Sequence, residues 1–238
     1  GNSAESAADD RGVDVGQLAA TSRPEQPQAV ACALRRRDER ASGAQELALA
    51  AAQDELTALD TAIGDGDHGL NMHRGFSKAQ EKLAAEAGKD LGSLSKSVGM
   101  TLLSTVGGAS GPLYGTFFIK AAPALNGKNE ADLATLAQAI ADGSAGLVAR
   151  GQAAAGDKTM VDVWLPVAEV LKQAAASGVS LKDALQAAAR TAQEQAEATI
   201  PLVAKKGRAS YLGERSAGHK DPGAASSALL LQCLAEAV

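Results

Sequence analysis

Three aspartates in a short, glycine-rich stretch are the residues of this chain best suited to chemistry. Asp60, Asp65 and Asp67 stand in the segment DTAIGDGDHGLN. Their spacings do not stack on one face of a helix, so a loop must bring the carboxylates together. Carboxylate oxygens are the ligands that Mg²⁺ prefers. Taken alone, the stretch is equally compatible with a metal site and with a solvated acidic turn.

Two further glycine-rich connections could meet a phosphate. Residues 106–112 read VGGASGP, and backbone N–H groups that precede a helix make a phosphate cradle. Paired glycines also permit close packing of helices, which is the plainer explanation. Residues 156–160 read GDKTM, and Lys158 in this segment is expected either to meet phosphate or to be exposed.

A long connection over residues 205–223 reads KKGRASYLGERSAGHKDPG. Loops of this length without secondary structure are usually functional or disordered. Arg208 could pair with phosphate oxygens, and the alternative is a mobile, solvated flap. Three aspartates and a nucleoside diphosphate sum to a charge of about −6, which two Mg²⁺ ions would reduce to about −2. Together the loops indicate a site for a divalent metal and a nucleotide.

Helices are expected to position these loops. Alanine and leucine, the best helix formers, carry most of the apolar content, and the segments between the loops repeat apolar residues at helical spacing. We predict an all-α fold with about eight helices, over residues 45–59, 69–86, 91–106, 112–125, 131–150, 161–176, 180–203 and 224–237. Ser180 is the expected N-cap of its helix, and Pro166 is expected to delay or kink the helix that contains it.

Composition excludes several classes of protein. The formal charge of −5 argues against general binding to nucleic acid, and no apolar run is long enough to span a membrane. The P-loop string is absent, and weak strand candidates at 117–119 and 161–167 lie inside helical patterns. Cys32 and Cys233 form no paired motif and are expected to be reduced, which suggests a cytoplasmic protein.

The chain divides into a tail and a body. Residues 1–40 lack an apolar period and are expected to be weakly ordered, with a frayed helix near residues 29–40 at most. Residues 41–238 are expected to form one helical domain.

The strings around these loops resemble one family. LD-x-x-IGDGDHGLNM-x-RGFSK, GMTLLSTVGGASGPLYGTFFI, RG-x₄-GDKTM-x-DVWLPV and KKGRASYLGERSAGH-x-DPGA are similar to the nucleotide-binding L subunits of phosphotransferase-type dihydroxyacetone kinases. The resemblance runs in order from about residue 45 to residue 238. It implies eight antiparallel helices in a barrel, with the nucleotide bound among the loops at one end.

The resemblance also implies a set of site residues. Asp60, Asp65 and Asp67 would bind two Mg²⁺ ions. The expected nucleotide contacts are His68, Gly69, Leu70, Asn71, Ala109, Ser110, Gly151, Met160, Arg208, Asp221, Pro222 and Gly223. Gly66 replaces an alanine often seen in the family, which is expected only to loosen the loop.

The mechanism implied is a relay. Tightly bound ADP would be phosphorylated by a multiphosphoryl carrier protein of the phosphoenolpyruvate phosphotransferase system. The γ-phosphoryl would then pass to dihydroxyacetone held on a separate K subunit. Because the work is positioning and charge neutralisation, this chain needs no nucleophile or general base of its own.

Three alternatives stay open. An ATP-dependent dihydroxyacetone kinase has a similar aspartate loop but joins it to a substrate domain. A kinase acting on protein-carried fatty acids usually reads D-G-D-T-G, and His68 argues against it. A non-enzymatic module that binds a partner such as a transcriptional regulator would use the same residues.

Overall fold

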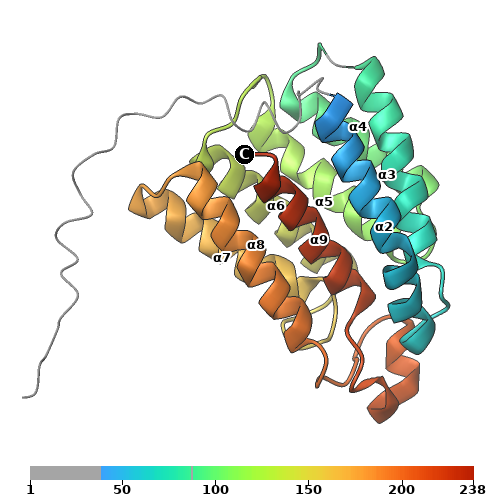
Figure 1. Ribbon diagram of the computed structural model, residues 1–238. Coiled ribbons are helices and arrows are strands. Elements are labelled where there is room, and N and C mark those ends of the chain that lie inside the picture. The colour runs from blue at the N-terminus through green and yellow to red at the C-terminus, as the bar shows by residue number, and fades with distance from the viewer. Residues whose placement is uncertain (1–38, 87) are drawn as a thin grey trace, which may run out of the picture.

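The computed structural model describes residues 39–86 and 88–238, and these fold as a ring of α-helices (Figure 1). The elements are α2 (Glu39–Ile63), α3 (His68–Ala85), α4 (Leu91–Thr105), α5 (Ser110–Leu125), α6 (Leu133–Gly151), α7 (Val161–Ser177), α8 (Leu181–Ala198), the 3₁₀ helix η2 (Arg208–Ser216) and α9 (Pro222–Glu236). No strand occurs among the described residues. The prediction of an all-α fold is therefore confirmed, and both weak strand candidates lie in helices.

Each α-helix packs against the next one along the chain, and α9 packs against α2. This last contact closes the ring into a barrel (Figure 1). Fully buried side chains fill its interior: Met72, Leu102, Tyr114, Leu147, Val163, Leu171, Leu185 and Leu231. Small residues let the helices approach closely, and a Cβ on Gly99 would lie 2.7 Å from the carbonyl oxygen of Gly115.

The alternation of helix direction gathers the glycine-rich connections at one end of the barrel. The connections over 64–67, 106–109, 152–160 and 199–221 each precede a helix that starts there, namely α3, α5, α7 and α9. We call this the loop end. Figure 1 shows η2 at the loop end, beside the end of α2. Every segment that carried a predicted site residue is therefore brought to one place.

Two boundaries, the effect of Pro166 and the structure of one connection differ from the expectations. α2 continues to Ile63, so Asp60 lies in its last turn and not in a loop. α8 ends at Ala198, where Pro201 soon prevents a helix from continuing. α7 starts at Val161 despite Pro166, since a proline there removes only one early hydrogen bond. The 205–223 connection, expected to lack structure, contains η2 with a kink at Gly213.

The structure also bears on the expected N-cap of α8, the two cysteines and the tail. The side chain of Ser180 accepts a hydrogen bond from the N–H of Asp183, which confirms it as the N-cap of α8. Cys233 is half-buried and free, whereas Cys32 lies outside the described residues. So do the tail of residues 1–38 and most of its frayed helix. Among the described helices, none combines the length and the apolar character that crossing a membrane requires.

Candidate metal and nucleotide site

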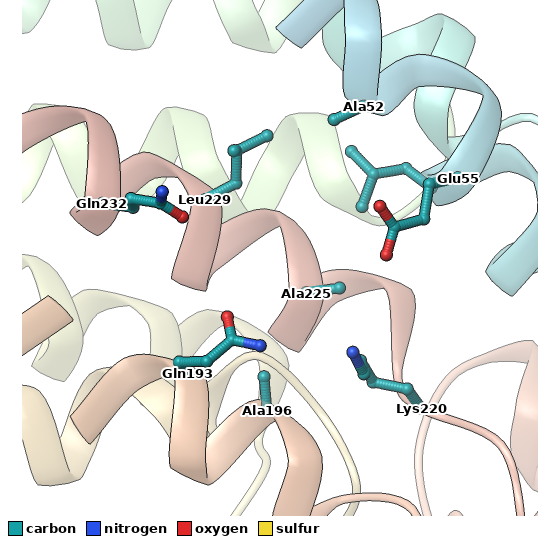
Figure 2. A pocket seen from close by; sticks show the side chains of 9 residues that line it. Ala52, Glu55, Gln193, Ala196, Lys220, Ala225, Leu229 and Gln232 are labelled. Carbon is teal, nitrogen blue, oxygen red and sulfur yellow. The ribbon is translucent and has the colours of Figure 1, made fainter. Parts of the chain in front are cut away.

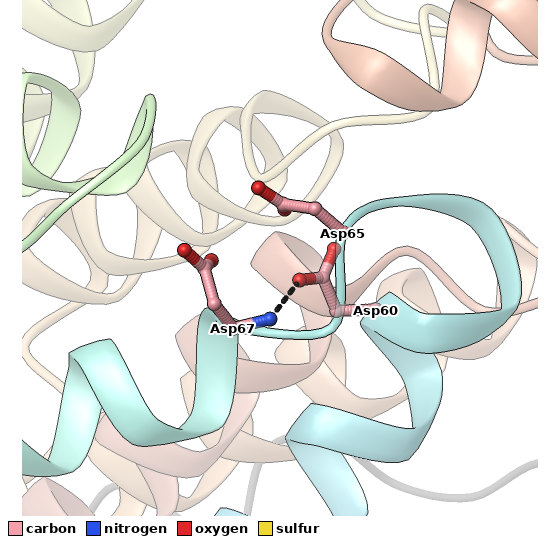
Figure 3. A group of neighbouring side chains, drawn as sticks. All are labelled: Asp60, Asp65 and Asp67. Carbon is pink, nitrogen blue, oxygen red and sulfur yellow. Dashed lines mark hydrogen bonds between the residues drawn. The ribbon is translucent and has the colours of Figure 1, made fainter.

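The three aspartates of the glycine-rich stretch form a cluster at the loop end. Asp60 comes from α2, Asp65 from the connection, and Asp67 directly precedes α3. One carboxylate oxygen from each lies within 4.8 Å of the others, and Figure 3 shows the side chains grouped along one turn of chain. Three carboxylates this close repel one another unless a cation lies between them. Their oxygens suit a hard divalent ion.

Local hydrogen bonds explain how the cluster is built. Oδ2 of Asp60 accepts a hydrogen bond from the N–H of Asp67 at 2.9 Å (Figure 3). It accepts another from the N–H of His68 at 3.1 Å. Gly66 has a φ of 73°, and a Cβ there would lie 2.7 Å from Oγ1 of Thr61. The expectation that Gly66 merely loosens the loop is wrong, because alanine would be strained in this backbone.

Arg208 connects the long connection to the cluster. Nη2 of Arg208, at the start of η2, lies 3.0 Å from Oδ2 of Asp65. The side chain of Arg208 is 65% exposed and that of Asp65 34%, so solvent screens the pair and it contributes little to stability. A guanidinium beside an acidic metal cluster is well placed to meet the phosphate of a metal-bound nucleotide.

His68 lies just beneath the cluster, between two hydroxyl groups. Its Nδ1 is 3.0 Å from Oγ of Ser110, and its Nε2 is 2.9 Å from Oγ of Ser226. Burial lowers the pKa of His68, although the carboxylates of Asp60 and Asp67 oppose this effect. Both ring nitrogens therefore face hydroxyl groups, and burial favours the neutral ring. This arrangement favours a contact or packing role over phosphoryl carriage.

The start of α9 closes the other side of the site. The buried carboxylate of Asp221 caps the helix by accepting a hydrogen bond from the N–H of Ala224 at 2.7 Å. Burial raises the pKa of Asp221 to about 7. The next residues, Pro222 and Gly223, begin α9, and a Cβ on Gly223 would lie 3.3 Å from Cε of the buried Met160.

The remaining predicted residues also lie at the loop end, with varied surroundings. Gly69 packs against α2, since a Cβ there would lie 2.0 Å from the carbonyl oxygen of Gln53. Leu70 is 52% exposed, whereas the buried Asn71 accepts a hydrogen bond from Arg74 at 2.7 Å. Ala109 directly precedes α5, and Gly151 ends α6. Their contacts with a nucleotide stay predictions.

Lys158 is neither exposed nor placed to meet phosphate, so both expectations for it are wrong. Its side chain is 1% exposed, and Nζ donates hydrogen bonds to the carbonyl oxygens of Thr199, at 2.7 Å, and Ile200, at 3.3 Å. A third goes to the carbonyl of His219. Lys158 thereby fastens the ends of the long 199–221 connection to the barrel.

Replacing Lys158 with methionine should destabilise the protein strongly. The apolar stem is kept, but three backbone carbonyls lose a buried donor, so the free energy of unfolding should fall by about 2–4 kcal/mol. Thermal denaturation without nucleotide measures this loss. The control is Lys182→Met on the exposed face of α8, where a change of less than about 0.5 kcal/mol is expected. Equal stability of the two variants would contradict the fastening role.

Two hollows adjoin these elements. One of about 630 Å³ lies beside the aspartate cluster and is lined by Thr61, Ala62, Ile63, Gly64, Arg208, Tyr211 and Leu212. The other, of about 200 Å³, lies between α2, α8 and α9, where Glu55 and Lys220 face the same space (Figure 2). Only the first is lined by a predicted site residue.

Comparison with known proteins places the chain in a family. A model described as the DAK2 domain matches residues 62–236, which is more than half of the chain. The chain belongs to the DAK2 domain family. This DAK2 domain is 57% identical over 180 residues to the ADP-binding subunit DhaL of the PEP-dependent dihydroxyacetone kinase of Escherichia coli, covering 76% of this chain and 86% of that one.

Parts of larger kinases are similar to this chain. The D-erythrulose kinase of Mycolicibacterium smegmatis is 39% identical over 201 residues, which cover 84% of this chain and 35% of that one. The crystal structure of the dihydroxyacetone kinase of C. freundii matches all of this chain over 38% of its own length, at 27% identity and a TM-score of 0.64. A second structure of that kinase, in complex with AMP-PNP and Mg²⁺, matches with 25% identity and a TM-score of 0.61.

Sequence reasoning missed several residues that build this DAK2 site. Lys158 was expected to be exposed or to meet phosphate, Ser110 was expected only as a nucleotide contact, and Ser226 and Tyr114 were not singled out. The available signal was weak: Ser226 and Ser227 interrupt an otherwise apolar helix, and Tyr114 is one of two tyrosines in the chain. A buried polar pair in such a helix implies a buried partner.

Proposed function

We propose that this chain is the ADP-binding, phosphoryl-transferring subunit of a PEP-dependent dihydroxyacetone kinase. The observation that carries the proposal is the 57% identity to the DhaL subunit, which exceeds the 39% identity to the D-erythrulose kinase. The clustering of Asp60, Asp65 and Asp67 at one end of the barrel supports it. Bound ADP would act as a cofactor that is phosphorylated and used in place.

The residues at the loop end divide the work. Asp60, Asp65 and Asp67 would hold two Mg²⁺ ions, which neutralise phosphate charge when bound. The first turns of α3 and α5 would offer backbone N–H groups to phosphate oxygens, those of Gly69 and Leu70 on α3 and those of Ala109 and Ser110 at α5, whereas the N–H of His68 already donates to Asp60. Arg208 would release Asp65 in part and pair with the transferred phosphoryl group. Nothing in this division requires a nucleophile from the chain.

Two macromolecular partners follow from this relay. A multiphosphoryl carrier protein would deliver the phosphoryl group, and a K subunit would present dihydroxyacetone. Both would have to approach the loop end, one after the other, because the nucleotide stays there. The proposal includes, as a further partner, a transcriptional regulator that senses the state of this end.

Reconstitution tests the proposal. The chain is mixed with a K subunit and dihydroxyacetone, and is supplied either with the phosphorylated carrier and trace ADP or with ATP alone. Sustained turnover with the carrier at catalytic ADP supports the relay. Turnover sustained only by free ATP would instead select the ATP-dependent kinase, an alternative that the similarity to the D-erythrulose kinase keeps in view.

Removing the metal should lower the melting temperature of the nucleotide-loaded protein. Ligand present at about a thousand times its Kd stabilises the folded state by about 4 kcal/mol, or roughly 10 °C for a domain of this size. Adding a chelator to ADP-loaded protein should therefore lower the Tm by about 10 °C. Nucleotide-free protein treated alike is the control and should change little. Identical melting curves for loaded protein with and without chelator would oppose a metal-dependent site.

A further inference from the structure

A continuous chain of buried hydrogen bonds lies behind the candidate site. It joins the starts of all four helices that begin at the loop end of the described structure, α3, α5, α7 and α9. The side chains involved are His68 on α3, Ser110 and Tyr114 on α5, Trp164 on α7, and Ser226 and Ser227 on α9. Tyr114, Ser226 and Ser227 are each 0% exposed. We call this set the hydroxyl network.

The contacts of the hydroxyl network are short. On the side toward the aspartate cluster, the OH of Tyr114 lies 2.7 Å from Oγ of Ser226, and this Oγ lies 2.9 Å from Nε2 of His68. On the side away from the cluster, the OH of Tyr114 lies 2.8 Å from Oγ of Ser227. This Oγ also accepts a hydrogen bond from Nε1 of Trp164 at 2.9 Å. All three hydroxyls also approach one carbonyl oxygen, that of Gly223, with Ser227 nearest at 2.8 Å, Ser226 at 3.1 Å and Tyr114 at 3.3 Å.

Counting hydrogens gives the network a direction. The indole N–H of Trp164 only donates, the carbonyl of Gly223 only accepts, and each hydroxyl has one hydrogen. If Ser227 donates to Gly223, then Tyr114 donates to Ser227 and Ser226 donates to Tyr114. Nε2–H of His68 must then donate to Ser226. This direction places a hydrogen in every contact of 2.9 Å or shorter and leaves only the longer approaches of Ser226 and Tyr114 to the carbonyl of Gly223 without one. The opposite direction would leave the oxygens of Ser227 and Gly223 2.8 Å apart with no hydrogen between them.

This direction determines the state of His68. The network requires an N–H at Nε2, so a ring with a single N–H carries it there and Nδ1 accepts the hydrogen of Ser110 at 3.0 Å. A fully satisfied buried network holds its members in one arrangement. His68 and Ser110 lie at the outer end of the network, beside the aspartate cluster, whereas Trp164 and Gly223 lie at its inner end.

We propose that Tyr114 and Ser226 are positioning residues for the nucleotide site. They hold His68 in one orientation and one tautomer, and they fix the starts of α3, α5, α7 and α9 relative to one another before nucleotide binds. A site ordered in advance avoids the cost of ordering during binding, which tightens retention of the ligand. This inference rests on the proposed nucleotide-binding function.

Ser226→Ala tests the inference because it removes the contact between His68 and Tyr114. The ¹⁵N signals of the His68 ring, assigned by their loss in His68→Gln among only three histidines, report the tautomer in nucleotide-free protein. The unsubstituted protein should show Nε2–H alone, whereas the variant should show the Nδ1–H form. ADP bound with Mg²⁺ should also leave the variant about tenfold faster.

Ser144→Ala is the matched control. Oγ of Ser144 is a buried hydroxyl, 2% exposed, that donates a hydrogen bond to the carbonyl of Ile140 at 2.7 Å on α6. Its loss should reduce stability without changing the His68 tautomer or the rate of ADP release. Tyr114→Phe serves if Ser226→Ala does not fold. It frees the hydrogen of Ser226 to turn toward Nε2, so Nε2–H should no longer be the sole form, and ADP release should be several-fold faster.

Two results would overturn the positioning role. One is an Nδ1–H ring in the unsubstituted protein, and the other is unchanged ADP release in the network variant. If the unsubstituted protein retains no ADP, the proposed function itself fails. The tautomer of nucleotide-free protein still tests the direction of the network in that case, so the two failures can be told apart.

Discussion

Replacing Asp67 with asparagine should weaken Mg²⁺-dependent retention of ADP by at least about 100-fold. The amide keeps the size of the side chain but removes the charge that a hard cation needs. Of the three positions, Asp67 is the one where substitution should disturb the fold least, because its side chain makes no capping hydrogen bond to α3. Asp60, in contrast, also holds the loop through two N–H groups. Titration calorimetry with ADP, with and without Mg²⁺, measures the effect.

Asp132→Asn is the matched control for this experiment. Asp132 caps α6 at the opposite end of the barrel, by accepting a hydrogen bond from the N–H of Thr135 at 2.8 Å. Asparagine is also a good N-cap, so this variant removes the same charge with little structural cost. Its ADP affinity should stay within about twofold of the original. Equal affinities of the two variants would refute the metal site.

Replacing Arg208 with methionine should reduce turnover about a thousandfold while leaving the fold intact. An arginine that meets the transferred phosphoryl group supplies charge where it develops in the transition state, which is worth this much in phosphoryl transfer. Its side chain is 65% exposed, so the loss of the Asp65 pair should change the free energy of unfolding by less than about 1 kcal/mol. Single-turnover transfer from ATP-loaded protein to the K subunit separates this step from carrier binding.

Arg215→Met is the control for Arg208. It removes an exposed arginine from the far end of η2. Turnover should remain within about twofold of the original, since an exposed surface charge away from the site is screened. Arg208→Lys should fall between the two, because lysine restores the charge but not the forked geometry. Turnover of Arg208→Met within tenfold of the original would remove Arg208 from the transfer step.

The sequence predicted the helices well because their signal is local. Apolar residues at helical spacing placed α3 at residues 69–86, and the structure has it at His68–Ala85. The gathering of the four loops at one end also follows from simple alternation of helix direction. The binding of Mg²⁺ and ADP by these loops stays a prediction, and the cluster of Asp60, Asp65 and Asp67 is consistent with it.

Long-range partners explain what the sequence could not show. The ammonium of Lys158 meets carbonyls 41 to 61 positions away, and no local pattern encodes that meeting. The Tyr114–Ser226 contact spans 112 positions and depends on α9 closing the ring. η2 was missed for a different reason, since a short 3₁₀ helix broken at Gly213 has no apolar period to detect.

The closed ring has a practical consequence for measurements on this protein. α2 starts and α9 ends at the end of the barrel away from the loops, where Figure 1 places the C-terminus. A biotin or a fluorescent label attached after Val238 would therefore point away from the aspartate cluster. Immobilised through such a tag, the protein would present its loops to solution, so that two large partners can be delivered in turn to the same face without steric interference from the support.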